Sequence, residues 1–510
     1  MKTLPDFQAF AGRYGVGGKG QAQVVWTTLV SDLETPVSAM LKIGCGRPNS
    51  FLLESVEGGA IRGRYSFIGL RPDVIWRCKG NGADINRDAV ARPNSFKPCP
   101  VGRESGAIES LRALVKESRI DLPAELPPMA SGLVGYMAYD MVRLVERLPD
   151  KNPDVIDVPD SIFLRPTVMA VFDSLKDSVT VITPVWPGSN ASAKEAYDAA
   201  RQRLEAVVTD LRTGKTMSSE PPDAAAAVSA TPQSNMTRER FHAMVKKAVE
   251  YIHAGDAFQI VPSQRFRLPF ALPPFSFYRA LRRLNPSPFL FFLDFAGFCV
   301  AGSSPEILVR VRDGKITLRP LAGTRKRGAT PAEDKALAKE LLADPKEIAE
   351  HLMLLDLGRN DVGRVAKVGT VRVTEQFIVE YYSHVMHIAS NVEGDLDPKF
   401  DAIDALLAGF PAGTVSGAPK VRAMEIIDEL EPERRGVYAG CIGYFGANGD
   451  MDTCIALRTA VIKDRILFVQ AGGGVVADSD PENEYQESCN KARALIKAAE
   501  EAVEFSAGVS

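Results

Sequence analysis

Short runs in which apolar and polar residues alternate recur along the chain and predict β-strands. Residues 22–30 (AQVVWTTLV) and 177–186 (DSVTVITPVW) are of this kind in the first part of the chain. Strand-like pairs follow in the second part at 258–268, 289–295 with 298–305, 307–321 and 439–472. Two of these pairs contain the dipeptides Asp313–Gly314 and Asn448–Gly449. Such dipeptides are typical of tight antiparallel hairpins.

Helix-like stretches lie between the hairpins. Residues 193–211, 332–357, 399–407 and 482–505 are expected to be helical, and Thr237 is expected to cap a further helix that ends at Gly255. Hairpins that alternate with helices are typical of the α+β class rather than of a parallel doubly wound sheet. We therefore expect antiparallel β-sheets packed on each other and flanked by helices.

Residues 213–236 interrupt this pattern. They are rich in Ser, Pro, Ala and Thr and contain almost no large apolar side chain, so they cannot contribute to a core. We expect a flexible linker here, which divides the chain into a first part, 1–212, and a second part, 237–510.

Composition narrows the class of protein. Of 510 residues, 45% are hydrophobic and 25% charged, which is the balance of a globular protein. A net charge of -3 gives no reason to expect nucleic acid or an anionic membrane as a partner. Seven cysteines without a CxxC pair argue against a disulfide framework and against a structural zinc site. Neither a signal-like start nor an apolar run long enough to span a bilayer is present, so the expected location is the cytoplasm.

Two pairs of glutamates are candidate metal ligands. Glu347 and Glu350 are three residues apart on one predicted helix, and Glu484 and Glu487 are three apart on another, with Lys491 four residues beyond. Such spacing places both side chains of a pair on one helical face. Four facing carboxylates would repel one another unless a hard cation such as Mg²⁺ lay between them. The alternative is that each pair is a solvated acidic surface.

Three further features are suited to binding an anion. Residues 470–478 (QAGGGVVAD) place three glycines after a strand, where backbone N–H groups can approach an anion, although an ordinary turn would have the same sequence. His387 is an acid or base candidate, or a hydrogen-bonded structural residue on a strand face opposite to His384. Arg458 is a charge in an apolar strand, which needs either a substrate carboxylate or an internal ion pair. Together these features predict a small dianionic substrate bridged by a divalent metal to carboxylates.

The motifs also resemble a known family. Residues 237–499 are similar to the chorismate-utilising enzymes throughout. Residues 51–69 (FLLESVEGGAIRGRYSFIG) and 131–149 (SGLVGYMAYDMVRLVERLP) resemble the N-terminal part of the anthranilate synthase component I family. The resemblance implies the chorismate-binding enzyme fold with an N-terminal α+β regulatory region. It also implies a lyase that converts chorismate and ammonia to anthranilate and pyruvate with Mg²⁺, the first committed step of tryptophan biosynthesis.

The same resemblance implies roles for individual residues. Glu306 would be the general acid that protonates the departing C4 hydroxyl, and His387 and Thr414 would take part beside it. Glu350 and Glu487 would bind Mg²⁺ directly, with Glu347 and Glu484 near or bound through water. The residues implied to bind the substrate are Gly323, Thr324, Tyr438, Arg458, Gly472, Gly473, Gly474 and Lys491.

Two positions distinguish members of the family. Members that add water to chorismate carry a lysine where this chain has Gln259, and aminodeoxychorismate synthases carry a nucleophilic lysine where it has Ala322. A methyl group cannot attack, and ammonia needs no base to activate it, so the resemblance favours direct addition of ammonia. These two sister activities remain the rival interpretations. A rival of another class, a catalytically inactive subunit that binds tryptophan, would be expected to have lost Glu306, Glu350, His387 or Glu487.

Partner and regulation are also implied. None of the seven cysteines lies in the G-x-C-x-G turn of glutamine amidotransferases, so we expect a separate amidotransferase chain, component II, in a hetero-oligomer. The LLES and NPSPFL segments resemble a tryptophan feedback site. For Cys454 an inert core position is the alternative to a place near that site. The residues implied for tryptophan feedback are Glu54, Ser55, Pro288, Phe289, Leu290 and Cys454.

Overall fold

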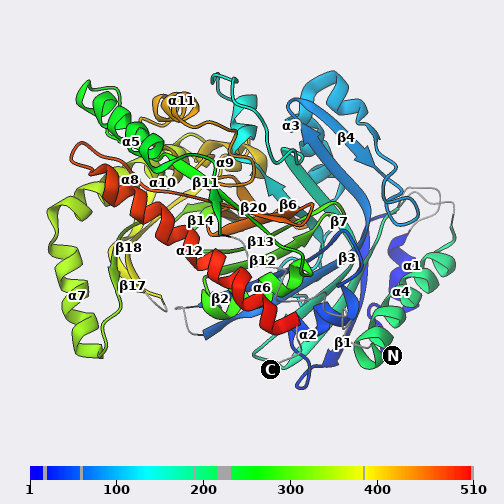
Figure 1. Ribbon diagram of the computed structural model, residues 1–510. Coiled ribbons are helices and arrows are strands. Elements are labelled where there is room, and N and C mark those ends of the chain that lie inside the picture. The colour runs from blue at the N-terminus through cyan, green and yellow to red at the C-terminus, as the bar shows by residue number, and fades with distance from the viewer. Residues whose placement is uncertain (15–19, 58–60, 188–190, 215–230, 383–384, 507–510) are drawn as a thin grey trace.

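The computed structural model describes residues 1–14, 20–57, 61–187, 191–214, 231–382 and 385–506 (Figure 1). The helices are α1 (Phe7–Tyr14), α2 (Pro36–Ile43), α3 (Pro100–Glu117), η1 (a 3₁₀ helix, Tyr139–Leu144), α4 (Ala193–Thr213), α5 (Arg238–His253), α6 (Pro274–Leu284), α7 (Pro331–Ala343), α8 (Pro345–Gly363), α9 (Ala402–Gly409), α10 (Gly413–Ser416), α11 (Lys420–Leu430) and α12 (Pro481–Ser506). The strands are β1 (Gln23–Val30), β2 (Ser50–Glu57), β3 (Ile61–Lys79), β4 (Gly82–Asn86), β5 (Lys97–Pro98), β6 (Gly132–Met137), β7 (Ser161–Asp173), β8 (Ser178–Val185), β9 (Gln233–Ser234), β10 (Gln259–Ile260), β11 (Ser263–Pro269), β12 (Phe289–Asp294), β13 (Phe298–Ser304), β14 (Ile307–Arg312), β15 (Lys315–Leu318), β16 (Leu321–Lys326), β17 (Arg372–Tyr381), β18 (Val385–Asp395), β19 (Gly417–Ala418), β20 (Cys441–Gly446), β21 (Met451–Ile455), β22 (Thr459–Lys463) and β23 (Ile466–Gly472).

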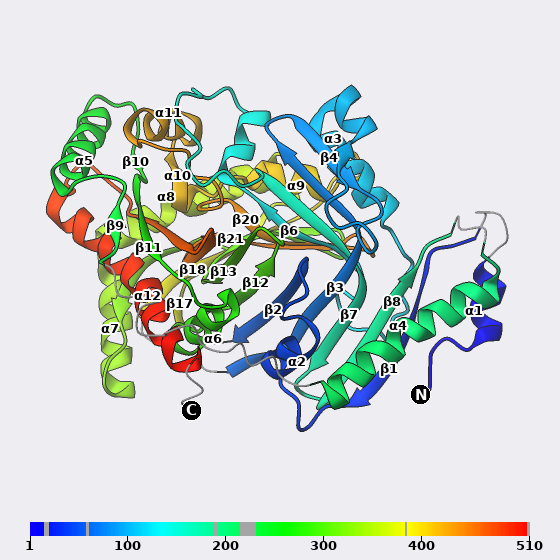
Figure 2. The same ribbon diagram turned by 45° about the vertical axis from the view of Figure 1, so that its right-hand side comes forward.

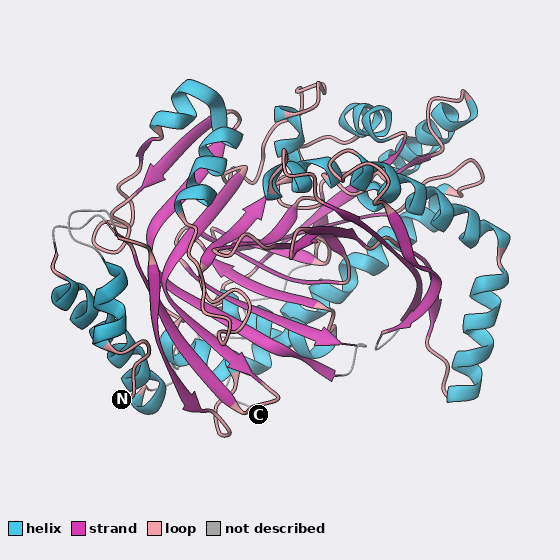
Figure 3. Cartoon of the chain, turned by 180° about the vertical axis from the view of Figure 1, so that it is seen from behind, coloured by secondary structure: helices cyan, strands magenta, loops and turns pink. Residues whose placement is uncertain are grey.

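Antiparallel pairing connects nearly all of these strands. In the described residues a 21-stranded sheet system winds through the molecule, and β10 and β19 form a separate pair. The strands occupy the middle, and the helices lie around them (Figure 3). The predicted α+β class with antiparallel sheets flanked by helices is confirmed.

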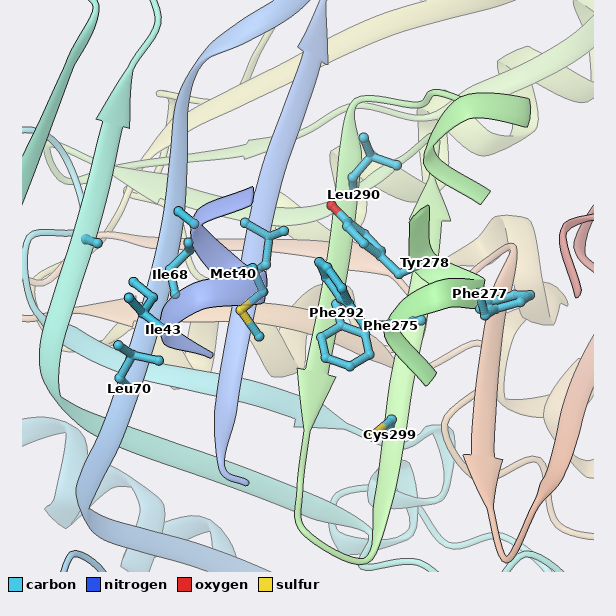
Figure 4. Packing of buried hydrophobic residues seen from close by; sticks show 14 of the residues in the cluster. Met40, Ile43, Ile68, Leu70, Phe275, Phe277, Tyr278, Leu290, Phe292 and Cys299 are labelled. Atoms are coloured by element: carbon cyan, nitrogen blue, oxygen red, sulfur yellow. The ribbon is translucent and has the colours of Figure 1, made fainter. Parts of the chain in front are cut away.

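Strands from the two parts of the chain pair with each other at two places within this system. β2 pairs with β12, so that Ser55 lies opposite Phe289, and β6 pairs with β20. One core cluster contains Met40, Ile68, Phe275 and Phe292, which come from both parts (Figure 4). The boundary expected at 213–236 therefore does not separate two independent cores. Burying both faces of these strands requires partners that are distant in the sequence.

The expected linker is only partly described. Residues 215–230 lie outside the described residues, as does His384. At its end, β9 pairs with β11 and Met236 is buried, so residues 233–236 belong to the fold. Before it, α4 extends to Thr213 and lies along β1 and β8 (Figure 2).

Most of the other predicted elements are present, and one of the expected helices is divided. Thr237 caps α5, and the hairpin β14–β15 turns at Asp313 and Gly314. The helix expected over 332–357 is instead two helices, α7 and α8, because Asp344 has an extended backbone and caps α8, with Pro345 at its first position. Proline is favoured at that position and would break a continuous helix.

The seven cysteines are all unpaired in the structure. No helix in the described parts of the chain combines the length and the apolar character that a membrane span requires.

Candidate active site

A cavity of about 240 Å³ lies where β16, β18, β23, α8 and α12 meet. It contains fifteen of the residues that the sequence analysis singled out, drawn from segments more than 200 positions apart. Those that line it are Gln259, Glu306, Ala322, Gly323, Thr324, Glu350, His387, Thr414, Tyr438, Arg458, Gly472, Gly473, Gly474, Glu487 and Lys491.

Glu306 lies between β13 and β14, directly before the first residue of β14, and is 6% exposed. Its carboxyl group accepts hydrogen bonds from the Thr414 hydroxyl at 3.2 Å and the backbone N–H of Leu321 at 3.4 Å. Burial raises the pKa of Glu306 to about 8, although both hydrogen bonds favour the charged form. The side chain is therefore a neutral carboxylic acid at neutral pH and can donate a proton into the cavity.

This protonation state predicts a pH dependence. At a constant concentration of free ammonia, the rate of a reaction that needs Glu306 as an acid should fall as the pH rises through about 8. The sign follows from the raised pKa, because the proton is held below that value and lost above it. A pH–rate profile checks this, and a rate that stays constant well above pH 8 would contradict the role.

His387 lies on β18 beside the bulge in β16. Its Nδ1 is 3.0 Å from both the Gly323 carbonyl oxygen and the Thr324 hydroxyl. Burial lowers the pKa of His387 to about 4, although the hydrogen bond to the Gly323 carbonyl acts to raise it. The ring is therefore neutral at neutral pH. A carbonyl can only accept, so Nδ1 carries the proton and Nε2 remains free as an acceptor.

The sequence pattern predicted that Arg458 lies within a strand, and this prediction is wrong. β21 ends at Ile455 and β22 begins at Thr459, so Arg458 occupies the corner between them, with φ 48°. Burial lowers its pKa, and its Nη1 donates to the side-chain oxygen of Asn285 at 3.3 Å. No acidic side chain forms an ion pair with Arg458 among the described residues. The guanidinium therefore fits an anionic ligand better than an internal ion pair.

The glycine loop closes another wall of the cavity. Cβ atoms at Gly473 and Gly474 would come within 2.8 Å of Glu484 Oε2 and 2.5 Å of Gln259 Nε2, so a larger residue at either position would displace the end of that glutamate or glutamine side chain. Lys491 Nζ donates to the Gly472 carbonyl at 2.9 Å. The backbone N–H of Gly473 donates to the Pro262 carbonyl at 3.3 Å, so it is already engaged.

The two glutamate pairs lie on α8 and α12, and the charge of Glu487 acts on Glu350 of one pair and on Glu484 of the other. Burial raises the pKa of Glu350, and the charges of Glu347 and Glu487 raise it further. Burial also raises the pKa of Glu484, and the negative charge of Glu487 raises it further. Glu484 Oε2 is buried and has no hydrogen-bond partner among the residues that the structure describes. This excess of negative charge is suited to a cation.

Basic and amide side chains hold these carboxylates apart. Arg325 pairs with Glu347 at 2.9 Å, Lys491 with Glu487 at 2.7 Å, and Gln259 donates to Glu350 at 3.0 Å. Within the described ranges, no three acidic, His or Cys side chains are arranged as a ready-made metal site. Glu347 and Glu484 stand behind the cavity wall rather than in its lining.

A second cavity, of about 1080 Å³, lies between β2, β12 and β21. Its lining includes all six residues named for the feedback site: Glu54, Ser55, Pro288, Phe289, Leu290 and Cys454. Glu54 is buried there against α6, bonded to Tyr278 at 2.5 Å and to Arg282 at 2.6 Å. The two cavities share Pro305 and Leu321 in their walls.

The polar partners of three candidate site residues, Arg458, Glu347 and Glu54, were not predicted from the sequence. Arg458 is bonded to Asn285, Glu347 to Arg325, and Glu54 to Arg282. Only Asn285 had a signal in the sequence, because it begins the NPSPFL segment.

Comparisons with known proteins show which family the chain belongs to. Residues 74–497 match the sequence model of the chorismate binding enzyme family. Anthranilate synthase component 1 from Cereibacter sphaeroides is 59% identical over 483 residues, which cover 95% of each chain. The protein of that name from Pseudomonas putida is 48% identical over 92% of this chain and 93% of its own.

Solved structures give the same result. Anthranilate synthase component I from Streptococcus pneumoniae superposes with a TM-score of 0.73 at 38% identity, covering 85% of this chain and 92% of that one. The menaquinone-specific isochorismate synthase from Escherichia coli has a TM-score of 0.70 at 19% identity, covering 95% and 96% of the two chains, and shares the fold. The chain therefore belongs to the chorismate binding enzyme family and, within it, to anthranilate synthase component 1.

Proposed function

We propose that this chain converts chorismate and ammonia to anthranilate and pyruvate. The observation that carries the proposal is the buried Glu306, bonded to Thr414, in a cavity whose Arg458 has no acidic partner among the described residues. Chorismate carries two carboxylates and a hydroxyl group that leaves poorly. Arg458 and Lys491 supply positive charge for the carboxylates, and Glu306 supplies the proton that lets the hydroxyl depart as water.

The reaction begins with attack of ammonia at C2 of the ring. The double bonds shift, the C4–O bond breaks, and Glu306 protonates the leaving oxygen, which gives aminodeoxyisochorismate and water. Loss of pyruvate then makes the ring aromatic, and that gain drives the second step. His387, neutral and with Nε2 free, is positioned to accept a proton during these transfers. Thr414 orients the Glu306 carboxyl group through its hydrogen bond.

Magnesium fits the four glutamates. Glu350 and Glu487 would hold the ion, with Glu347 and Glu484 nearby. The support is their mutual repulsion and the buried, unpartnered oxygen of Glu484. When bound, the ion would neutralise the substrate carboxylate beside these acids.

Gln259 and Ala322 favour addition of ammonia over the two sister reactions. Both line the cavity, and neither can act as a base or a nucleophile. Water addition would lack a lysine to activate the water, and a covalent route would lack its lysine nucleophile. Retention of Glu306, Glu350, His387 and Glu487 in one cavity argues against an inactive regulatory subunit.

The purified chain provides the test. It would be incubated with chorismate, Mg²⁺ and ammonium salt at mildly alkaline pH, and anthranilate fluorescence would be followed with and without tryptophan. We expect anthranilate, and less of it when tryptophan is present. Failure to bind chorismate would overturn the proposal.

In the cell the ammonia would come from glutamine through a separate amidotransferase, component II, in a cytoplasmic hetero-oligomer. The numbering of the related proteins as component 1 supports a second component. Mixing the chain with such a partner should make the reaction glutamine-dependent.

Tryptophan would act at the second cavity as a feedback inhibitor. Ser55 is half-buried in its lining, so Ser55→Phe should fill space that the inhibitor needs. Catalysis should remain, while the inhibitory tryptophan concentration rises roughly tenfold or more, which corresponds to about 1.4 kcal/mol of lost binding. Inhibition curves measure this. Thr28→Phe, which adds the same ring at an exposed position near the end of β1, is the control, and identical curves for Ser55→Phe and wild type would place the inhibitor elsewhere.

A further inference from the structure

Arg435 and Glu431 form a buried ion pair behind the wall of the active-site cavity. Arg435 is 2% exposed and Glu431 is 4% exposed. The Arg435 Nη2 atom donates to Glu431 Oε1 at 2.6 Å, and its Nε lies 3.0 Å and 3.2 Å from the two carboxylate oxygens. This forked contact fixes the plane of the guanidinium group, because both partners are planar and held at several points.

The same guanidinium group holds the backbone of two segments that line the cavity. Nη2 donates to the Val261 carbonyl and Nη1 to the Val415 carbonyl, each at 2.6 Å. Val261 lies two residues after Gln259. Val415 directly follows Thr414, whose hydroxyl bonds to Glu306. A shift of Arg435 would therefore move the groups that face the reacting end of the substrate.

Glu431 holds a third segment. Its Oε1 accepts hydrogen bonds from the backbone N–H and the hydroxyl of Ser263 at 2.8 Å and 2.7 Å. The Ser263 hydroxyl in turn accepts from Gln470 Nε2 at 2.8 Å, and Gln470 lines the cavity just before the glycine loop. The Arg435 guanidinium also lies 5.6 Å from the ring centre of Tyr438, another residue of the cavity.

We propose that Arg435 and Glu431 are positioning residues, which set the relative placement of Gln259, Thr414 and the glycine loop without contacting the substrate. This inference rests on the proposed function. A buried ion pair adds little net stability compared with well-packed apolar residues, so its geometry is the better reason for its presence. Rates depend steeply on such placement, because a misplacement of about 1 Å can cost on the order of 10² in rate.

The variant Arg435→Lys tests the proposal. Lysine keeps the charge, but one ammonium group cannot reach Glu431, Val261 and Val415 together in the geometry of the fork. We expect kcat with ammonia to fall on the order of 10²-fold, with a smaller change in KM for chorismate. Glu431→Gln, which keeps an acceptor for Ser263, should give a milder loss of the same kind. It carries the test alone if Arg435→Lys does not fold.

Arg165→Lys is the matched control. Arg165 is also a buried arginine, bonded to Asp73 at 2.9 Å, and it is not part of the cavity lining. Its variant should lower the melting temperature yet leave kcat and KM unchanged. Wild-type kcat and KM in folded Arg435→Lys, or losses of kcat that merely follow melting temperature in all three variants, would overturn the inference. An inactive wild-type chain would instead contradict the proposed function.

Discussion

Glu306→Gln is expected to lower kcat about 10²–10⁴-fold while the protein stays folded. Glutamine matches the size of the glutamate and can still accept hydrogen bonds from Thr414 and Leu321. It has no acidic proton, so the C4 hydroxyl would have to leave without one. The pH-dependent fall in rate near pH 8 should vanish as well, because the group responsible for it is gone.

Steady-state kinetics and circular dichroism check this result. Glu117→Gln is the control, since Glu117 is a carboxylate on α3, paired with Arg87 and absent from the cavity lining. It should retain wild-type kinetics. Activity of Glu306→Gln within a few-fold of wild type would show that another group supplies the proton.

Glu487→Gln is expected to abolish turnover and to weaken magnesium binding. The change removes one negative charge from a carboxylate that lines the cavity and lies near Glu350 and Glu484. Loss of a charged metal ligand typically lowers metal affinity and activity far more than loss of a neighbouring surface charge does. Calorimetric titration with Mg²⁺ gives a readout that does not depend on activity.

Glu500→Gln on the same helix is its control. Glu500 is exposed and lies more than three turns beyond Glu487 along α12, so its variant should bind Mg²⁺ and turn over as the wild type does. Near wild-type activity in Glu487→Gln would remove this residue from the metal site.

Local patterns in the sequence predicted the elements well. Alternating residues identified β1 and β8, and capping residues identified the start of α5 at Thr237. These signals are local, because strand alternation and capping depend on neighbouring residues. The break at Asp344 was missed, since the apolar pattern runs through it and only Pro345 marks the new helix.

Long-range arrangement was harder to predict. Pairing of β2 with β12 joins segments more than 230 residues apart, and no periodicity reports such a pairing. The same limit applies to side-chain partners. Arg458 was recognised as an unusual charge, but its corner conformation and its contact with Asn285 depend on how β21, β22 and α6 meet. Ion pairs such as Arg435 with Glu431 are likewise invisible until their burial is known.

The glutamate pairs, the glycine loop, His387 and Arg458 could be proposed from the residues themselves, whereas the other candidate site residues came only from the family resemblance. Glycine loops, paired glutamates and isolated charges are costly unless they have a partner or a ligand, so they stand out in the sequence. In the structure Glu350, Glu487, His387, Arg458 and the three glycines line one cavity, whereas Glu347 and Glu484 do not.

The mass of the product formed from chorismate and ¹⁵N-labelled ammonium tests the central proposal most directly. We expect anthranilate that carries the label, formed together with pyruvate in equal amount and only when Mg²⁺ is present. Unlabelled isochorismate or salicylate would show that water is the nucleophile. Labelled aminodeoxychorismate would show that Ala322 and Gln259 do not direct ammonia to C2, and either product would contradict the account.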